Sequence, residues 1–254
     1  MIRKTVRGLA KKFGYDIVKP DERLVVDGLP ADFDVATVDT YKRVKPFTMT
    51  TPERIASLVN AVNYLVKNNI RGDFVECGVW RGGSTMAAID TLLKAGDKSR
   101  EIYLYDTYEG MSEPTEVDKV FTGTGADLLM ETTDREDPTS VWCYSAIEDV
   151  QRNVGTLKYP TEKIHFVKGK VEDTIPQTLP GKIALLRLDT DFYESTAHEL
   201  KHLYPLLVPG GVIIIDDYGH WEGARKAVDE YIEAEKLPLL LNRIDYTGRI
   251  GIKY

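Results

Sequence analysis

Two pairs of aspartates in the second half of the chain each follow an apolar run that is typical of a buried strand. Asp189 and Asp191 follow one run, and Asp216 and Asp217 follow the next. The carboxyl ends of parallel strands meet at one edge of a sheet, where open α/β folds bind their ligands. Carboxylates gathered there repel one another, so a compact site needs a cation among them. Oxygen ligands without imidazole or thiolate favour Mg²⁺ over Zn²⁺. The acid pairs therefore predict a magnesium site.

A magnesium ion held in this way keeps coordination positions for water or substrate. An acceptor with adjacent hydroxyls, such as a sugar or a catechol, could fill two of them. The metal would then orient the reacting hydroxyl and lower its pKa, while a remaining carboxylate removes the proton. The chemistry that these acids predict is therefore the transfer of a group to a hydroxyl.

A glycine-rich loop in the first half of the chain has the form of a cofactor site. The segment FVECGVWRGGS, residues 74–84, runs from a strand pattern through a glycine turn into a helix, with Glu76 before the turn. Dinucleotide sites use G-x-G-x-x-G, whose tight turn holds a pyrophosphate. The spacing here, E-x-G-x-x-x-G-G-S, resembles that of methyltransferases, whose cofactor carries no phosphate. Asp106 ends the next strand pattern, where its carboxylate could accept both ribose hydroxyls or only cap the following turn.

The elements that would carry these residues alternate between strands and helices. Short apolar runs predict strands at residues 74–77, 102–106, 164–168, 183–188 and 212–215. Helical patterns lie near residues 84–94, 145–154, 195–204 and 222–235, and Thr51 with Pro52 marks the start of another helix. This alternation predicts an α/β fold with a mostly parallel sheet. Residues 237–241 and 249–253 flank a turn and predict an antiparallel hairpin at the sheet edge.

We expect an N-terminal helical extension and connector over residues 1–46 and one catalytic domain over residues 47–254. Residues 1–20 hold six Lys or Arg residues against one Asp, with apolar residues at near-helical spacing. This pattern predicts a basic amphipathic helix, which we interpret as packing on its own domain or on another subunit, with membrane-surface binding as the alternative. Residues 107–140 form a long polar segment, which we interpret as a lid because loops of that length are usually functional.

Composition narrows the function further. A chain of 254 residues with 43% hydrophobic residues can bury a full core. Its formal net charge of -7 argues against a nucleic-acid partner, which needs a basic surface. No apolar run approaches the roughly 18 residues of a spanning helix, and the basic N-terminus lacks the apolar part of a signal peptide, so we expect a cytoplasmic protein without a membrane span. Cys77 and Cys143 are expected to be free thiols, because they form no Cys-x-x-Cys pair.

The order and spacing of four segments resemble the macrocin O-methyltransferase family from about residue 47 to residue 254. The segments are FVECGVWRGGS, LYDTYEGM, LRLDTDFYEST and IIIDDYGHW. The resemblance implies a Rossmann-like class I fold with a seven-stranded sheet, which binds S-adenosylmethionine (SAM) and Mg²⁺. It also implies that Asp189, Asp216 and Asp217 bind the metal and that Asp191 is the general base. Catechol O-methyltransferases, a more distant resemblance, use a lysine near that position, so an aspartate base favours the enzymes that modify sugars.

The same resemblance assigns the cofactor site. Glu76, Gly78 and Ser84 would surround the methionine part of SAM, and Asp106 would bind its ribose. The remaining cofactor residues implied are Gly169, Val171 and Glu172 beside the adenine, with Thr48 and Met49 closing over the cofactor. His220 would contact the acceptor, or would be an ordinary surface histidine. Trp142 would face the cofactor or belong to the core.

The implied activity is Mg²⁺-dependent methylation of a sugar hydroxyl on a glycosylated natural product, with a catechol-like acceptor as the alternative. From the basic N-terminal helix and the long lid we expect subunit contacts, and therefore a homo-oligomer, a dimer or larger. A protein that binds the cofactor without catalysis is a third hypothesis, which predicts that Asp191 is dispensable.

A competing motif points to a different class of enzyme. His198, Glu199 and His202 match the H-E-x-x-H pattern of zinc peptidases, with Glu222 at the distance of a third ligand. Two features argue against it: Lys201 places a charge within the motif, and Pro205 disrupts the helix one turn later. An iron site built from two histidines and a carboxylate is similarly disfavoured.

Overall fold

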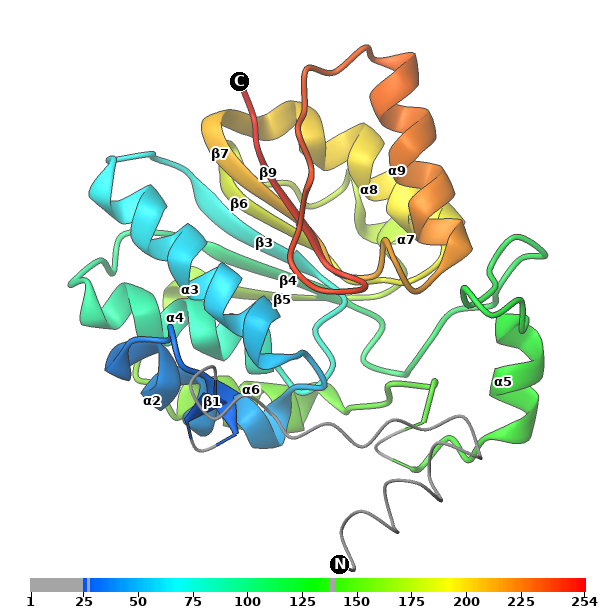
Figure 1. The fold of residues 1–254 in the computed structure, drawn as a ribbon, viewed down its shortest axis with the longest axis horizontal. Coiled ribbons are helices and arrows are strands. Elements are labelled where there is room, and N and C mark those ends of the chain that lie inside the picture. The colour runs from blue at the N-terminus through cyan, green and yellow to red at the C-terminus, as the bar shows by residue number, and fades with distance from the viewer. Residues whose placement is uncertain (1–24, 27, 138–139) are drawn as a thin grey trace, which may run out of the picture.

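One mixed sheet of seven strands forms the centre of the protein (Figure 1). The computed structural model describes residues 25–26, 28–137 and 140–254. The strands of the sheet are β3 (Asp73–Cys77), β4 (Ile102–Asp106), β5 (Ile164–Lys168), β6 (Ile183–Leu188), β7 (Leu207–Ile215), β8 (Asn242–Arg243) and β9 (Arg249–Ile252). Their order is β5-β4-β3-β6-β7-β9-β8, with β5 to β7 parallel and β9 antiparallel to β7. The predicted α/β fold, a mostly parallel sheet with an antiparallel edge, is confirmed.

The strand register aligns the carboxyl ends of β3, β6 and β7, and the predicted site residues follow these ends. Cys77 at the end of β3 pairs with Leu188 at the end of β6, and Leu188 pairs with Ile215 at the end of β7. The residues that follow these three strand ends therefore lie side by side. The strand order reverses between β3 and β6, and open α/β sheets bind ligands at such a switch point.

Two layers of helices enclose the sheet (Figure 1). One layer contains α2 (Val35–Val44), α3 (Pro52–Lys67), α4 (Gly83–Lys94) and α6 (Ile147–Gly155). The other contains α7 (Val171–Thr174), α8 (Tyr193–Leu203) and α9 (Glu222–Ala234). Each layer closes its own core, with Ile89 and Leu92 fully buried in the first and Leu203 in the second. Each such side chain contributes about 1.5–3 kcal/mol of burial energy.

Helix α3 begins as the sequence predicts. The Thr51 hydroxyl accepts the backbone N–H of Arg54 at 3.3 Å, and Pro52 occupies the first turn. Proline is favoured there because its missing N–H would have no partner within the helix. This start fixes the segment before the helix and directs Arg54 toward the carboxyl edge of the sheet.

Ordered structure also precedes residue 47, within the predicted connector. Strands β1 (Val25–Val26) and β2 (Leu29–Pro30) pair with each other, and α2 packs against α4. Asp34 caps α2 by accepting the N–H of Thr37 at 2.7 Å. Asp90 of α4 joins the helices through the Thr40 hydroxyl at 2.7 Å, so α2 belongs to the layered body. The domain boundary at residue 47 and the lid role of residues 107–140 stay predictions, and the basic helix predicted over residues 1–20 lies outside the described residues.

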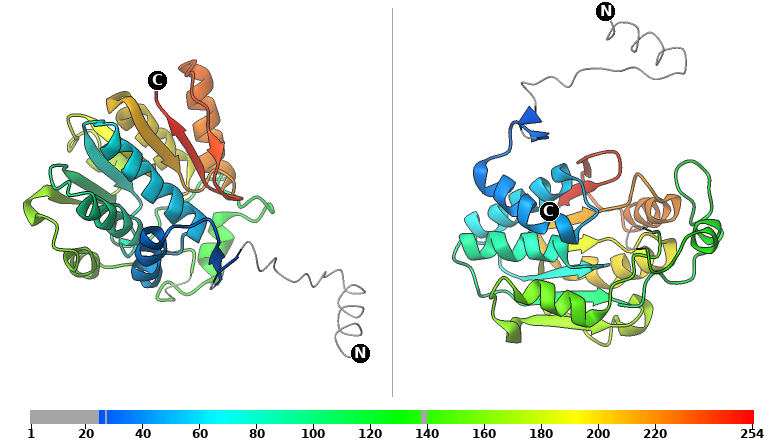
Figure 2. Two further views of the ribbon diagram at one scale, coloured as in Figure 1. Left: turned by 60° about the vertical axis from the view of Figure 1, so that its left-hand side comes forward. Right: turned by 90° about the horizontal axis from the view of Figure 1, so that it is seen from below.

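The segment of residues 107–140 contains a helix that periodicity did not predict, α5 (Ala126–Thr132) (Figure 2). Only Ala126 of this helix is buried, so it lacks the apolar stripe that a sequence pattern would reveal. The segment is nevertheless attached to the body. Val120 and Ala126 pack with Phe192, Trp221 and Ala224 in a small separate core.

The predicted antiparallel hairpin at the sheet edge is confirmed, but the predicted position of its first strand is wrong. The ladder forms at Asn242–Arg243, whereas residues 237–241 run beside the sheet without joining a strand. Pro238 lacks an N–H for a ladder bond, and Leu237, Leu239 and Leu241 pack against the core under α8 and α9. In the described residues, no helix is long and apolar enough to cross a membrane.

Candidate active site

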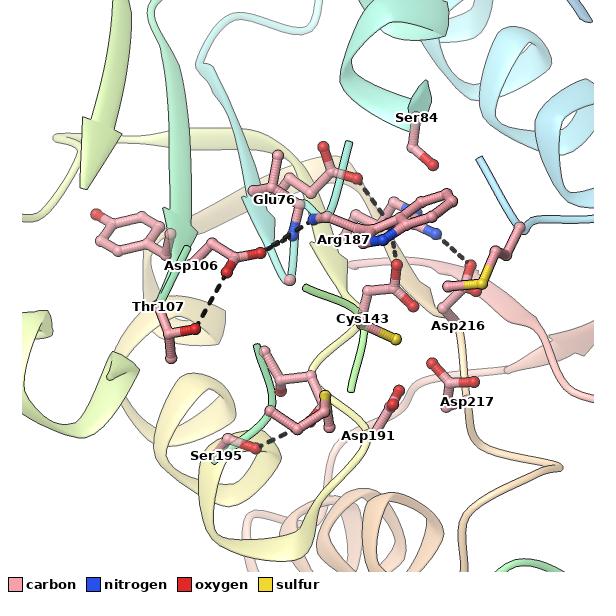
Figure 3. A pocket seen from close by; sticks show the side chains of 18 of the residues that line it. Glu76, Ser84, Asp106, Thr107, Cys143, Arg187, Asp191, Ser195, Asp216 and Asp217 are labelled. Atoms are coloured by element: carbon pink, nitrogen blue, oxygen red, sulfur yellow. Dashed lines mark hydrogen bonds and ion pairs between the residues drawn. The ribbon is translucent and has the colours of Figure 1, made fainter. Parts of the chain in front are cut away.

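A cavity of ≈ 390 Å³ opens at the carboxyl edge of the sheet, within the size range of small-molecule sites. Every residue that the sequence analysis assigned to the site lines it: Thr48, Met49, Glu76, Gly78, Ser84, Asp106, Gly169, Val171, Glu172, Asp189, Asp191, Asp216, Asp217 and His220. Figure 3 shows its acidic side chains, with Asp106 apart from Asp191, Asp216 and Asp217. The sheet therefore gathers residues that are up to 172 positions apart in the sequence (220 − 48 = 172).

The glycine loop is fitted tightly against the end of β6. Gly78 has φ +80°, and a Cβ there would overlap the backbone oxygen of Asp189. A residue larger than glycine would therefore push Asp189 away and would adopt a backbone conformation that side chains disfavour. Gly83, at the start of α4, is also packed closely against the backbone of Phe47, where a Cβ would meet the Phe47 oxygen at 2.5 Å. This contact places Thr48 and Met49 at the cavity wall.

Asp106 binds the glycine loop from the neighbouring strand. One carboxylate oxygen accepts the backbone N–H groups of Val79 at 2.6 Å and Trp80 at 3.0 Å, and the other accepts the N–H of Tyr108 at 2.7 Å. Asp106 thus caps the turn that follows it, which was one of the two interpretations from the sequence. Two amides that a phosphate would need are occupied by a carboxylate, which argues against a dinucleotide.

Glu76 is buried, with its carboxylate bonded on both sides. Arg187 donates to one oxygen at 2.7 Å, and the Thr85 hydroxyl donates to the other. Glu76 and Arg187 are also register partners on β3 and β6, so their side chains extend from the same face of the sheet. Burial raises the pKa of Glu76 although Arg187 opposes the shift.

Arg187 and Arg54 are the site residues that sequence reasoning missed. Arg187 also donates to Asp189 at 2.6 Å and to Asp216 at 2.7 Å, with 4% of its own side chain exposed (Figure 3). Arg54 forms a second ion pair with Asp216, and its Nε lies 3.1 Å from a carboxylate oxygen of Asp245. The available signal was a lone arginine inside the apolar run of residues 183–188, because a charge in a buried strand needs a partner. Arg54 gave no comparable signal, since charged residues are common on helices.

The acids fall into two groups. Asp189, Asp191 and Asp217, called the acid triad below, each offer an oxygen within 4.8 Å of the other two, as a shared cation would require. Asp217 is hydrogen-bonded to both other members, and a bond between two carboxyl groups needs a proton on one of them. The other group, called the paired acids, contains Glu76 and Asp216, which are compensated by the arginines.

Asp191 has a left-handed backbone conformation, with φ +69°. Such left-handed positions are infrequent outside glycine and cluster at functional sites. Burial raises the pKa of Asp191 to about 7. Burial also raises the pKa of Asp189 and of Asp217 well above the ordinary aspartate range. The triad is therefore a place where negative charge is disfavoured until a cation is present.

The remaining predicted residues surround this centre. Gly169 follows β5 and donates its N–H to the backbone oxygen of Asp106 at 3.0 Å, which holds the start of α7 near the glycine loop. Burial and the positive charge of Arg54 lower the pKa of His220, which favours its neutral form. Trp142 donates its indole N–H to the backbone oxygen of Met130 at 3.1 Å, so its polar edge is turned to residues 107–140.

The H-E-x-x-H motif does not assemble a zinc site in the described residues, where the acid triad is the metal-ligand group that forms. His198 bonds through Nε2 to the backbone oxygen of Ile175 at 2.7 Å. Glu199 is fully buried and accepts the Thr190 hydroxyl at 2.9 Å. Glu199 thus holds Thr190, the residue between Asp189 and Asp191.

Comparison with known proteins agrees with this geometry. The profile of the macrocin-O-methyltransferase (TylF) family matches residues 31–250. The 8-demethyl-8-(2,3-dimethoxy-alpha-L-rhamnosyl)-tetracenomycin-C 4'-O-methyltransferase of Streptomyces olivaceus is 33% identical over 90% of this chain and 84% of its own. The mycinamicin III 3''-O-methyltransferase of Micromonospora griseorubida is 32% identical over 79% of this chain and 76% of its own. The solved O-methyltransferase NovP is similar at a TM-score of 0.70 and 30% identity, over 82% of each chain.

Proposed function

The chain belongs to the macrocin O-methyltransferase family, and from this premise we propose that it transfers the methyl group of SAM to a sugar hydroxyl of a glycosylated small molecule, with Mg²⁺ as the metal. The observation that carries the proposal is the meeting of the glycine loop and the acid triad in one cavity. The first is suited to the cofactor and the second to the reacting hydroxyl.

The residues around the glycine loop fit SAM. The close approach at Gly78 leaves the loop backbone beside the cavity, and Ser84 lines it at the start of α4. Glu76 and Ser84 would hold the methionine part, and Asp106 would accept a ribose hydroxyl through the oxygen that receives the Tyr108 N–H, which has a second lone pair. Thr48, Met49, Gly169, Val171 and Glu172 would complete the cofactor site. When bound, SAM supplies a methyl group on a positively charged sulfur.

The acids fit a divalent cation with hard oxygen ligands. Asp189, Asp216 and Asp217 are the proposed ligands, and two of them belong to the triad. Asp216 already accepts two guanidinium groups, and its oxygens have lone pairs to spare. When bound, Mg²⁺ would orient the acceptor hydroxyl and lower its pKa.

Asp191 is the proposed general base. Its carboxylate would accept the proton that the acceptor hydroxyl loses on methylation, and bound SAM would supply the methyl group. The left-handed backbone at Asp191 and the Thr190 bond to Glu199 fix where this carboxylate stands. Much of the rate gain would come from alignment of the reacting atoms.

A sugar acceptor is favoured by the relatives, because the Streptomyces olivaceus enzyme is named for a rhamnosyl substrate. An aspartate rather than a lysine at position 191 argues in the same direction against a catechol acceptor. We also propose a homo-oligomer, which sedimentation velocity would detect, and a cytoplasmic location.

The test combines binding and transfer. Calorimetric titrations with SAM, MgCl₂ and ZnCl₂ should give binding of SAM and Mg²⁺. Transfer assays on a panel of glycosides, with MgCl₂ or with a chelator, should give a methylated sugar only in the presence of the metal. Tight zinc binding without SAM binding would overturn the proposal, and methylation in excess chelator would remove its metal part.

A further inference from the structure

Three aromatic rings meet at the mouth of the cavity. Phe121 lies 5.8 Å from His220 and 6.2 Å from Tyr246, and the rings of His220 and Tyr246 are 6.0 Å apart, all as centroid distances. All three pairs are edge-to-face, the arrangement that aromatic rings prefer. We call these three residues the aromatic rim. They come from three distant segments, so the tertiary structure alone assembles the rim.

The rim remains exposed although its rings are large. Phe121 is 61% exposed and Tyr246 is 51% exposed. Exposed aromatic side chains that gather in one place often mark a binding surface. His220 and Tyr246 also line the cavity, whereas Phe121 stands outside it. The surface therefore changes from acidic at the centre to aromatic at the mouth.

The backbone under Phe121 is held firmly, so the position of the ring does not depend on a free loop. Phe121 donates its N–H to the backbone oxygen of His220 at 2.9 Å, and Glu222 donates to the oxygen of Lys119 at 2.8 Å. The neighbouring Val120 is buried in the small core with Trp221. These bonds dock the segment onto the turn between β7 and α9.

Asp118 secures the same segment from the other side. It is 1% exposed, and one carboxylate oxygen accepts the N–H of Tyr193 at 2.8 Å, at the start of α8. Its other oxygen accepts the N–H and the hydroxyl of Thr115 at 2.7 and 2.8 Å. A buried carboxylate at a helix start is favourable because it meets unpaired amides and the positive end of the helix dipole. Phe121 is thus displayed on a rigid support.

We propose that the aromatic rim binds the apolar aglycone of the glycosylated acceptor, an inference that rests on the proposed function. The sugar hydroxyl must reach the acid triad, so the aglycone linked to that sugar extends toward the mouth. His220 stands between the two zones and contacts the sugar. Phe121 and Tyr246 contact the apolar rings beyond it and distinguish a full glycoside from a free sugar.

The experiment compares two acceptors that share one sugar. The first is the glycoside that the wild-type enzyme methylates fastest, chosen from rhamnosyl and other deoxysugar derivatives of tetracyclic and macrolide aglycones. The second is the methyl glycoside of the same sugar. Phe121→Ala should raise KM for the full glycoside about tenfold, the factor that corresponds to about 1.4 kcal/mol of lost contact. It should leave KM for the methyl glycoside and for SAM unchanged.

Matched variants separate this role from a structural one. Tyr246→Ala should also raise KM for the full glycoside. Tyr246→Phe keeps the ring and removes only the hydroxyl, which lies 3.3 Å from Nδ1 of His220, so any change that it causes should be equal for the two acceptors. Tyr254→Ala removes an aromatic residue that is 91% exposed beyond the end of β9 and should change nothing. If Phe121→Ala and Tyr246→Ala leave KM for the glycoside unchanged, or raise KM for both acceptors equally, the aromatic rim is not an aglycone site. If the wild-type enzyme methylates no glycoside of the panel, the proposed function fails first and the inference fails with it.

Discussion

Asp216 and Asp217 are neighbours in the sequence and belong to two differently compensated groups. Asp216 is 3% exposed and meets the guanidinium groups of both Arg54 and Arg187. Asp217 turns instead to Asp189 and Asp191, and among the described residues only Asp189 of these three receives a bond from an arginine. Arginine side chains thus compensate the paired acids, whereas the carboxylates of the acid triad lie close together with less compensation. The arginines stabilise the buried charges of Glu76 and Asp216, whereas the triad has less compensation, so we propose that a cation binds there, with Asp216 as a further ligand.

The largest effect is expected when the acid triad loses its proposed base. Asp191→Asn should lower kcat by about 10²–10⁴-fold, because the amide cannot take the hydroxyl proton. The Kd for SAM should stay unchanged, and the free energy of unfolding should not fall, since the substitution removes a charge from a repulsive group. Steady-state kinetics and calorimetry measure both quantities. Near-normal turnover would show that another group takes the proton.

The second effect concerns the paired acids. Arg187→Met should lower the free energy of unfolding by about 3–5 kcal/mol, because it leaves Glu76 and Asp216 buried without their shared cation. Urea unfolding measures this loss. The control is Arg152→Met, which breaks an ion pair between exposed side chains and should cost less than about 1 kcal/mol. If the two variants were equally stable, the buried ion pairs of Arg187 would contribute no more than an exposed pair, and the proposed difference between the two groups of acids would be wrong.

A third effect tests the cation of the acid triad. Saturating MgCl₂ should stabilise the wild-type protein by about 2.7 kcal/mol at a concentration of 100 times its Kd. Asp217→Asn should lose most of this gain, because it removes a proposed ligand. Asp127→Asn, at an acid on α5, serves as the control and should keep it. Thermal unfolding with and without MgCl₂ gives the answer, and an Mg²⁺ response that survives in Asp217→Asn would contradict the site.

The smallest effect concerns Asp90, an acid outside the site that also forms ion pairs. Burial of Asp90 opposes ionisation, but bonds from Lys94 and Thr40 outweigh it and lower the pKa of Asp90 below its ordinary value of 3.8. Its stabilising contribution is therefore present above pH 3.8 and is lost as the pH falls through the lower folded-state pKa. Asp90→Asn should cost about 1.5 kcal/mol near neutral pH, and urea unfolding should give a smaller difference in acid. Turnover per folded molecule should be unchanged, and a pH-independent difference would exclude the ionic contribution.

Much of the fold followed from the sequence because it depends on local patterns. Apolar runs gave the parallel strands, and Thr51 with Pro52 gave the start of α3. Two of the helices that were missed, α2 and α5, lack strong apolar stripes, since the buried positions of α2 include Thr37 and Thr40 and α5 buries only Ala126. The first strand of the hairpin was misplaced because Leu239 and Leu241 pack against a core that alternation cannot reveal.

The candidate site, like the fold, has features that follow from the sequence and features that depend on the tertiary structure. The sequence by itself determined that acids follow two strands and that a glycine turn follows another, and parallel strands bring such ends to one edge whatever the remaining details. Only the tertiary structure decided which acids meet arginines, since Arg54 and Asp216 are 162 positions apart. It also decided that Phe121 and Tyr246 meet beside His220. The physical reason is that charge compensation and ring contacts depend on distances of a few ångströms between side chains, which depend on packing rather than on local pattern.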